Sequence, residues 1–282
     1  MEEKRNFDLL TLGQVLLRLS PPNNDRLVRG DTFVKQVGGA ELNVAVGVAL
    51  LGLRTGVISK LPSHDMGSFM KGKIRSYGVS DDFFMYDDSP SARVGIYYYE
   101  NGAYPRKPKV IYDRANSSFY SLKIDEIPEK AYTASRCFHT SGITLALSPK
   151  VRETAIEMIK RFKAAGTLVS FDVNFRGNLW TGEEAKECIE QILPYVDIFF
   201  CSEDTARLTF KKTGTAREMM KSFTEEYPIS IVASTQRIVH SPKSHTFGSI
   251  IYDARKDIYY EEEPYRDIDV VDRIGSGDAY IS

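Results

Sequence analysis

Apolar runs of strand length alternate with segments of helical periodicity over most of the chain. Residues 7–13 (FDLLTLG) are apolar and end in glycine, which is typical of a buried strand. Leu42, Ala45 and Ala49 then recur at helical spacing. The same two patterns predict strands at 55–60, 135–142, 167–174, 196–201 and 229–234, and helices at 65–78, 149–165, 182–193, 203–212 and 215–226. Such alternation indicates an α/β fold whose mostly parallel sheet is covered by helices on both sides.

Two regions interrupt this rhythm. Residues 14–37 have the pattern of a hairpin around PPNND, and residues 91–120 contain two strand-like runs, VGIYYYE and KVIYD, on either side of a loop with glycine and proline. Both regions are too rich in β-branched, aromatic and turn residues for crossover helices. We expect them to pair into a small separate sheet that projects from the main one. Residues 248–253 and 257–262 predict a further antiparallel pair at the sheet edge.

Composition is ordinary for a globular protein and excludes some classes of function. The 282 residues are 42% hydrophobic and 27% charged, and a net charge of −1 from 37 basic and 38 acidic residues gives no basic excess for nucleic acid or an anionic membrane. The longest apolar run, residues 44–53, is far below the roughly 18 residues of a membrane span. We expect a single domain over residues 1–282 that binds neither nucleic acid nor membranes.

The cysteines carry no metal or disulfide pattern. Cys137, Cys188 and Cys201 are odd in number, scattered and without CxxC spacing, and each lies in an apolar context. We expect buried, reduced thiols in a cytoplasmic protein.

A glycine pair precedes the helix at 41–52. Gly38 and Gly39 would let the backbone approach a ligand closely, and Asn43 lies on the first helical turn. An ordinary tight turn before a helix explains the same glycines, so both interpretations stay open on this stretch.

Polar side chains follow the strand at 167–174. Asp172, Asn174 and Arg176 come at its carboxyl end, where ligands bind in open parallel sheets. Arg176 can grip an anionic group with two hydrogen bonds, or it can make a surface salt bridge.

Tyrosines gather in the second irregular region. Within the run 97–99, Tyr97 and Tyr99 share one face of a strand, and Tyr112 and Arg114 share a face of the following strand. A sheet over a crevice can act as a lid that supplies hydroxyl donors and excludes water. Tyrosine and arginine on one face suit a polyhydroxy substrate with a carboxylate, although packing or a dimer interface would use aromatic residues equally well.

The last thirteen residues are VVDRIGSGDAYIS. Their GSGD lacks the third glycine and the downstream acidic residue of a dinucleotide fingerprint. A plain strand-to-helix turn is one interpretation, with Asp278 favouring the helix dipole. The other is an anion hole made by the amides of Gly275, Ser276 and Gly277, followed by Asp278 as the base of a phosphoryl transfer.

Two segments together resemble a known family. GGAELNVAVGVALLG, beginning at Gly38, and DRIGSGDAY, far downstream, are similar to the paired signatures of the ribokinase-like (PfkB) sugar kinases, and the resemblance extends over essentially the whole chain. It implies a three-layer α/β/α fold with a small β-sheet lid, ATP and Mg²⁺ as cofactors, and a lid that mediates homodimers or higher homo-oligomers.

Within that family, FDVNFRGNLW and KVIYDR look most like 2-keto-3-deoxygluconate kinases. The resemblance implies that the sugar acid is held by Tyr97, Tyr112, Arg114 and Arg176. It implies sugar-hydroxyl contacts from Gly38, Gly39 and Asn43, and it makes Asp278 the catalytic base.

Two segments depart from the family pattern. An Asn-x-x-Glu element linked to Mg²⁺ and phosphate is replaced by CSEDTARL, where Ser202 and Thr205 align best and Glu203 or Asp204 would act through water. A glycine-rich turn is replaced by VASTQRIVHSPKSHTFGS, which reads as a polar loop. In this loop Ser234, Thr235 and Arg237 would contact phosphate or simply face solvent, and we expect His240 and His245 to be exposed.

The sequence ends at Ser282, whereas family members continue in helices that wall the adenine pocket. Either the natural chain is longer or the protein is a defective kinase. Alternatives to a 2-keto-3-deoxygluconate kinase are therefore another PfkB kinase of the fructokinase or ribokinase type, or a non-catalytic sugar-acid-binding protein of the same fold.

Overall fold

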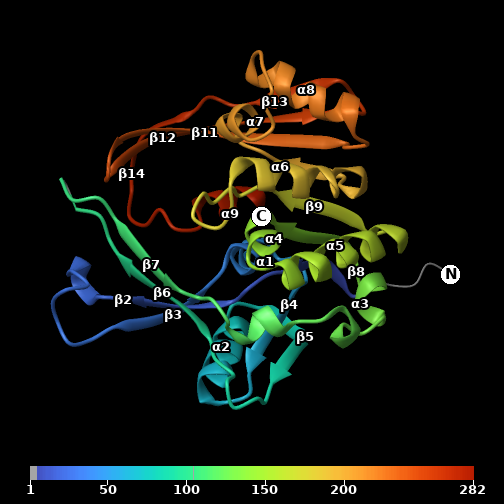
Figure 1. Ribbon diagram of the computed structural model, residues 1–282. Coiled ribbons are helices and arrows are strands. Elements are labelled where there is room, and N and C mark those ends of the chain that lie inside the picture. Colours follow the sequence, from blue (N-terminus) through green and yellow to red (C-terminus); the bar gives the residue numbers. More distant parts are fainter. Residues whose placement is uncertain (1–4, 104) are drawn as a thin grey trace.

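The computed structural model describes residues 5–103 and 105–282 as two sheets with helices packed around the larger one (Figure 1). The large sheet has the spatial order β13 (Ile258–Glu261), β12 (Ser244–Asp253), β11 (Ile231–Ser241), β10 (Ile198–Phe200), β9 (Leu168–Asp172), β8 (Ser135–Ser141), β1 (Phe7–Leu12), β4 (Thr55–Pro62) and β5 (Val79–Asp87), with β14 (Tyr265–Asp269) also paired to β12. Neighbours from β11 to β5 are parallel, whereas β12, β13 and β14 pair antiparallel. The expected mostly parallel α/β fold is confirmed.

Helices cover both faces because adjacent strand residues point to opposite sides. Leu9 of β1 packs with Val44 and Val48, whereas the next residue, Leu10, belongs to the main core together with Met158. The helices are α1 (Ala40–Leu50), α2 (Asp65–Ser76), α3 (Lys130–Thr133), α4 (Gly142–Ala146), α5 (Pro149–Ala164), α6 (Gly182–Glu190), α7 (Glu203–Leu208), α8 (Ala216–Glu226) and α9 (Ser276–Ile281). Helices α1 and α5 therefore lie on opposite faces of the sheet, which makes three layers.

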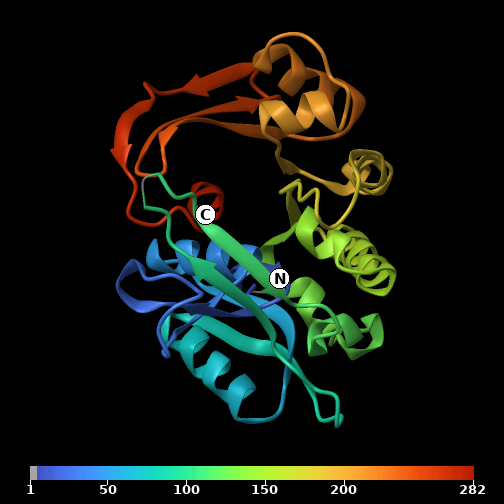
Figure 2. The same cartoon turned by 60° about the vertical axis from the view of Figure 1, so that its left-hand side comes forward.

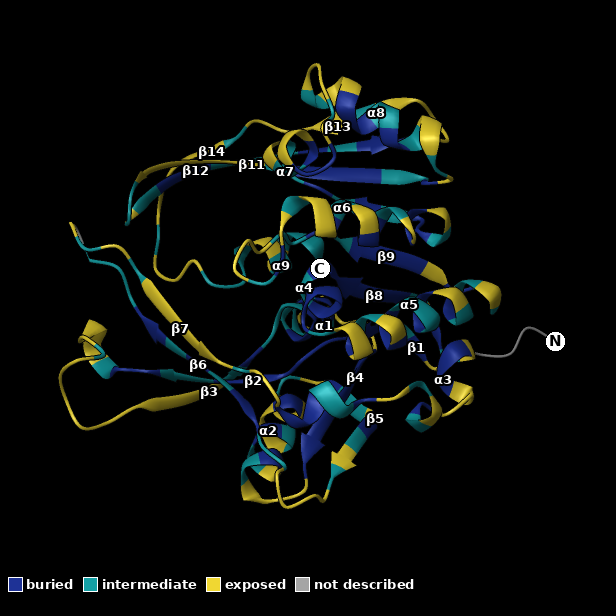
Figure 3. Ribbon diagram, viewed as in Figure 1, coloured by how far each residue is buried: buried dark blue, intermediate teal, exposed yellow. Residues whose placement is uncertain are grey.

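The small sheet is assembled from both irregular regions. Its order is β3 (Val34–Gly38), β2 (Leu16–Ser20), β6 (Gly95–Glu100) and β7 (Lys109–Asp113). The pairs β2–β3 and β6–β7 are antiparallel, and β2 and β6 join them in parallel. Figure 3 shows β7 and much of β3 exposed, whereas the central strands of the large sheet are buried. The predicted separate sheet is present.

Three local expectations need correction. Residues 232–249 are not a loop, because β11 and β12 form a long antiparallel hairpin there. His245 is consequently buried, with 5% of its surface exposed, while His240 is exposed and contacts Thr246 Oγ1 through Nε2 at 2.8 Å. Cys188 and Cys201 are buried as expected, but Cys137 is only half-buried.

No helix in the described part of the chain is both long and apolar enough to cross a membrane.

Candidate active site

A cavity of about 800 Å³ opens at the carboxyl ends of β9, β10 and β11. The first turn of α1 and the segment leading into α9 line it, as does one face of the small sheet. Of the predicted site residues, it brings together Gly39, Asn43, Tyr97, Tyr112, Arg114, Asp172, Asn174, Arg176, Ser202, Thr235, Arg237, Gly275, Ser276, Gly277 and Asp278. Figure 2 shows why one space can collect them, since the small sheet and α9 both lie beside this edge of the large sheet.

The glycine pair makes room for close contacts. Gly39 has φ of +149°, and a Cβ there would lie 2.6 Å from the carbonyl oxygen of Gln14. A Cβ on Gly38 would lie 2.8 Å from the hydroxyl of Tyr97, although Gly38 itself is not among the lining residues. Gly38 therefore allows Tyr97 to lie against the backbone, and Gly39 is the one that faces the cavity.

The small sheet presents an aromatic and cationic face. Tyr97 and Tyr112 are directly opposite on β6 and β7, with ring centroids 6.0 Å apart. The Arg114 guanidinium lies 5.4 Å from the centre of the Tyr112 ring, and its Nε donates to Gln14 Oε1 at 2.7 Å. Tyr99 does not line the cavity and packs instead with Tyr97.

Four arginines line the cavity without an acidic partner among the described residues, namely Arg114, Arg176, Arg237 and Arg273. Among the described residues, neither Arg114 nor Arg176 forms a salt bridge, and burial lowers the pKa of the Arg114 guanidinium. Arg176 donates from Nη1 to the carbonyl oxygen of Phe175 at 3.0 Å. Arg114 is half-buried and Arg176 is exposed. A guanidinium without an acidic partner can form charge-assisted hydrogen bonds with a carboxylate or phosphate, so these two arginines favour an anionic ligand.

The cavity also contains two carboxyl groups with raised pKa values, those of Asp172 and Asp278. Burial raises the pKa of Asp172 to about 7, and the nearby Asp278 carboxylate acts in the same direction. Burial also raises the pKa of Asp278 to about 6, against the effect of a hydrogen bond from Asn43. Asn43 Nδ2 donates to Asp278 Oδ2 at 2.7 Å, which orients the carboxylate. A carboxylate poised near neutral pH is suited to accept a proton.

Glu41 is a site residue that sequence reasoning missed. It lines the cavity with only 1% of its surface exposed, and Oε1 accepts hydrogen bonds from the hydroxyls of Ser141 at 2.6 Å and Thr144 at 2.7 Å. Burial raises its pKa. An acidic residue in the first helical turn looks like an ordinary dipole contact, so the sequence carries no signal for this role. The other lining residues missed are Gln14, Leu16, Ala40, Val110, Ile143, Val173, Phe175, Phe200, Cys201, Ala233, Arg273, Ile274, Tyr280 and Ile281.

Small residues shape the backbone before Asp278. Gly275 adopts a left-handed conformation with φ of +79° immediately before α9, and Arg237 donates from Nη2 to the Ser276 hydroxyl. Both side-chain contacts to this segment, from Asn43 and from Arg237, come from elements far away in the sequence. The segment is thus held from the α1 side and from the β11 side.

The sequence is similar to known carbohydrate kinases. The model of the pfkB family carbohydrate kinases matches residues 6–282. The chain belongs to this family. It is 33% identical to a 2-dehydro-3-deoxygalactonokinase of Haloferax volcanii, over 97% of this chain and 82% of that protein. It is 26% identical to a 5-dehydro-2-deoxygluconokinase of Listeria monocytogenes, over 99% of this chain and 82% of that protein.

The fold is also similar to that of a solved sugar kinase structure. The crystal structure of a 2-dehydro-3-deoxygluconokinase from Thermotoga maritima superposes with a TM-score of 0.90 at 31% identity, covering 96% of this chain and 84% of that one. The chain is therefore a sugar kinase with a ribokinase-like fold, and ATP is its phosphoryl donor.

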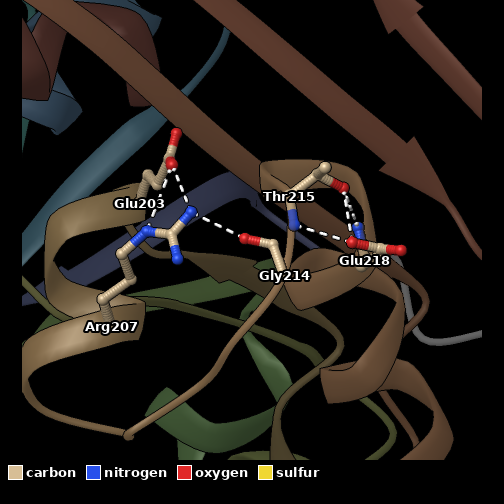
Figure 4. A network of polar contacts seen from close by, with 5 residues as sticks. All are labelled: Glu203, Arg207, Gly214, Thr215 and Glu218. Atoms are coloured by element: carbon tan, nitrogen blue, oxygen red, sulfur yellow. Dashed lines mark hydrogen bonds and ion pairs between the residues drawn. The ribbon is translucent and has the colours of Figure 1, made fainter.

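Two of the residues predicted for the nucleotide side of this kinase lie outside the cavity lining. Glu203 accepts hydrogen bonds from Arg207, at 2.8 Å for Nη2, and Arg207 also donates to the Gly214 carbonyl (Figure 4). Ser234 is buried without a hydrogen-bond partner among the described residues. Asp204 and Thr205 line the cavity in their place.

Proposed function

We propose that this kinase transfers the γ-phosphoryl group of ATP to a hydroxyl of a six-carbon keto-deoxy sugar acid, with 2-keto-3-deoxygluconate as the first candidate. The observation that carries the proposal is that Arg114 and Arg176, two of the four cavity arginines without an acidic partner, share the cavity with Asp278. A carboxylate is the substrate group that matches them. The names of the relatives, all kinases of dehydro-deoxy sugar acids, support the same class.

The small sheet and α1 would hold the sugar acid. Arg114 and Arg176 bind its carboxylate, Tyr97 and Tyr112 donate to oxygens along the chain of the sugar, and the amide beside Gly39 together with Asn43 contacts hydroxyls. The Gln14 side chain is a neutral partner for Arg114, so the positive charge of Arg114 stays available for the substrate.

Asp278 would act as the general base. Its carboxylate takes the proton of the attacking hydroxyl while that oxygen bonds to the γ-phosphorus, and the bond from phosphorus to the β–γ bridging oxygen breaks to release ADP. Amides of the segment Gly275–Gly277 would stabilise charge on the transferring group. Thr235, Arg237 and Ser202 line the cavity on the β10–β11 side, where they would contact the phosphates.

Magnesium would be held mainly by the phosphates of ATP. No group of three or more potential acidic, histidine or cysteine ligands is present among the described residues, which fits the usual Mg²⁺ arrangement of one or two carboxylates plus phosphate oxygens and waters. Asp204 lines the cavity and is the carboxylate that we assign to this ion, in place of Glu203. When bound, the ion would neutralise charge on the β- and γ-phosphates.

The outer face of the small sheet would join two copies of the chain. Leu19, Tyr98 and Ile111 lie side by side on the face opposite Tyr97, and Ile111 is 43% exposed. Light scattering on the purified chain should give the mass of a dimer, and Ile111→Asp should reduce it to a monomer. A monomeric wild-type chain would refute this assembly.

A substrate panel tests the proposed substrate class. With ATP and Mg²⁺, the chain is assayed on 2-keto-3-deoxygluconate, 2-keto-3-deoxygalactonate, 5-keto-2-deoxygluconate, fructose and ribose, and phosphorylated products are identified by mass. A site with arginines that lack an acidic partner should prefer the acids over the neutral sugars by about 10³-fold or more in kcat/KM. Equal kcat/KM values for acids and neutral sugars would rule out the sugar-acid assignment.

A further inference from the structure

The small sheet is tied to the segment before α9 by one ion pair. Arg18, on β2, places Nη2 2.8 Å from Asp272 Oδ2. The Arg18 side chain is 13% exposed and that of Asp272 is 38% exposed. Among the described residues, no other salt bridge joins the small sheet to residues 270–282.

Contacts within the small sheet restrain the Arg18 side chain. Its Nε donates to the Ser20 hydroxyl at 3.0 Å, and its guanidinium lies 4.5 Å from the centre of the Tyr99 ring. Because Tyr99 is buried and lies on β6, Arg18 is held by two strands of the small sheet. The planar guanidinium thus has one orientation, and that orientation points to Asp272.

Asp272 also contacts the backbone of the residues that follow it. Its second oxygen, Oδ1, accepts a hydrogen bond from the amide of Ile274 at 2.9 Å, which closes a local turn. The Ile274 side chain packs against Leu16, Tyr97 and Tyr99 of the small sheet. One carboxylate therefore contacts the small sheet with one oxygen and shapes the loop with the other.

The restrained turn leads directly to the proposed base. Gly275 follows Ile274, α9 begins at Ser276, and the Ala279 amide donates to the Gly275 carbonyl at 2.8 Å. A displacement of Ile274 must consequently move the first turn of α9, which carries Asp278.

We infer that Arg18 and Asp272 are a positioning pair that couples the small sheet to the Gly275–Asp278 segment. Under the proposed function, a sugar acid held by Tyr97, Tyr112 and Arg114 fixes the small sheet, and the pair then fixes the base and the phosphate-binding amides. Neither Arg18 nor Asp272 lines the cavity, so loss of the pair should impair turnover more than sugar binding.

Hydrogen–deuterium exchange tests the coupling without relying on activity. The full-length wild type, Arg18→Met, Asp272→Asn and the double variant are compared without ligand. We expect amides of residues 272–279 to exchange about tenfold faster in each single variant than in the wild type. The double variant should exchange no faster than either single variant, because the effects of mutating two residues of one network do not add. Arg93→Met is the matched control, since it removes the ion pair between Arg93 and Asp113 of β7, which involves no residue of 270–282.

Kinetics then separates positioning from a merely structural role. For whichever sugar the wild type phosphorylates, Arg18→Met should lower kcat about tenfold while the calorimetric Kd for that sugar changes less than about threefold, and Arg18→Lys should recover part of kcat. Unchanged exchange at 272–279 in Arg18→Met would overturn the inference, as would additive losses in the double variant. A wild type that phosphorylates no sugar acid would refute the proposed substrate while the exchange result still decides the coupling.

Discussion

Asn43 and Asp278 are 235 positions apart in the sequence, yet their side chains form a hydrogen bond of 2.7 Å that joins α1 to α9. The donor is an amide that cannot titrate, so it orients the carboxylate without supplying or removing a proton. Asn43 belongs to the first family signature and Asp278 to the second, so the two signatures are in contact through Asp278 Oδ2. The contact uses only Oδ2, so under the proposed function the other oxygen would accept the proton of a substrate hydroxyl.

Replacing Asp278 by asparagine should remove turnover and preserve sugar binding. The amide cannot accept a proton from the attacking hydroxyl, and we expect kcat to fall by about 10²–10⁴. Turnover is followed by ADP release and binding by calorimetry. Glu203→Gln is the control and should keep wild-type kcat, because Glu203 pairs with Arg207 and does not line the cavity. Near-normal turnover in Asp278→Asn would refute its role as the base.

The acidic limb of the pH–rate profile should report the ionisation of Asp278. Because the base must be ionised and the pKa of Asp278 is raised to about 6, kcat/KM should rise with pH through this region. The Glu41 carboxylate also raises the pKa of Asp278, so Glu41→Gln should shift the limb to lower pH. A limb that stays in place in this variant would show that Glu41 does not act on Asp278.

Asp172 should make the free energy of unfolding fall as the pH rises, whereas a salt-bridged carboxylate makes it rise with pH. Its pKa is raised from 3.8 to about 7 in the folded chain, so folding binds a proton between these values and the group's contribution to stability is lost as the pH rises. Asp172→Asn should therefore raise Tm at pH 8 by roughly 5 °C, with a smaller gain at pH 5. Differential scanning calorimetry at both pH values measures the difference.

Asp81→Asn supplies a control of opposite sign for that experiment. Although partial burial opposes it, the hydrogen bond from Arg75 lowers the pKa of Asp81. This variant should lower Tm at pH 8 and approach the wild type as the pH falls. Parallel pH dependence in the two variants would contradict the assignment of a raised pKa to Asp172.

Arg114→Met should discriminate between acidic and neutral substrates. Loss of a charge-assisted hydrogen bond should lower kcat/KM for sugar acids by about 100-fold and leave any activity on fructose within about threefold. Arg136→Met, at a side chain that is 73% exposed and paired with Asp8, is the matched control. Equal losses on acidic and neutral sugars would mean that Arg114 does not bind the carboxylate.

Gly275→Ala should separate backbone strain from displacement of the base. Alanine in the left-handed region costs roughly 1–2 kcal/mol, and its Cβ would lie 3.1 Å from Asn43 Nδ2. Gly52→Ala bears the same strain, with φ of +88°, but its Cβ would meet nothing within 4 Å. Both variants should lose similar Tm, and only Gly275→Ala should lose kcat. Full activity in Gly275→Ala would contradict the role of this glycine.

The sequence was informative where local patterns and tertiary structure agree. The parallel core is predicted because its strands are apolar on both faces, and β6 and β7 because their aromatic and β-branched residues are bounded by turn residues. Strand β5 was missed because its sequence, VSDDFFMYD, mixes acidic residues into an edge strand. The β11–β12 hairpin was read as a loop because its outer half is polar, and pairing between neighbours outweighs that polarity.

From the sequence, site residues could be predicted only where a charged or polar side chain follows a buried strand or a glycine-rich turn. Arg176 follows a buried strand and Asp278 follows two glycines, so both stand out. Gln14 and Glu41 acquire their roles from partners about 100 positions away, Arg114 for the first and Ser141 for the second. No local pattern encodes such contacts, and the same holds for the pairing of Arg18 with Asp272.

The parallel pairing of β2 with β6 has a consequence for engineering. Each of the two insertions supplies only half of the small sheet, so neither is a self-contained module that can be grafted alone between relatives. A chimaera that exchanges substrate preference would have to carry residues 14–38 and 95–114 as one unit, together with a matching residue at position 272.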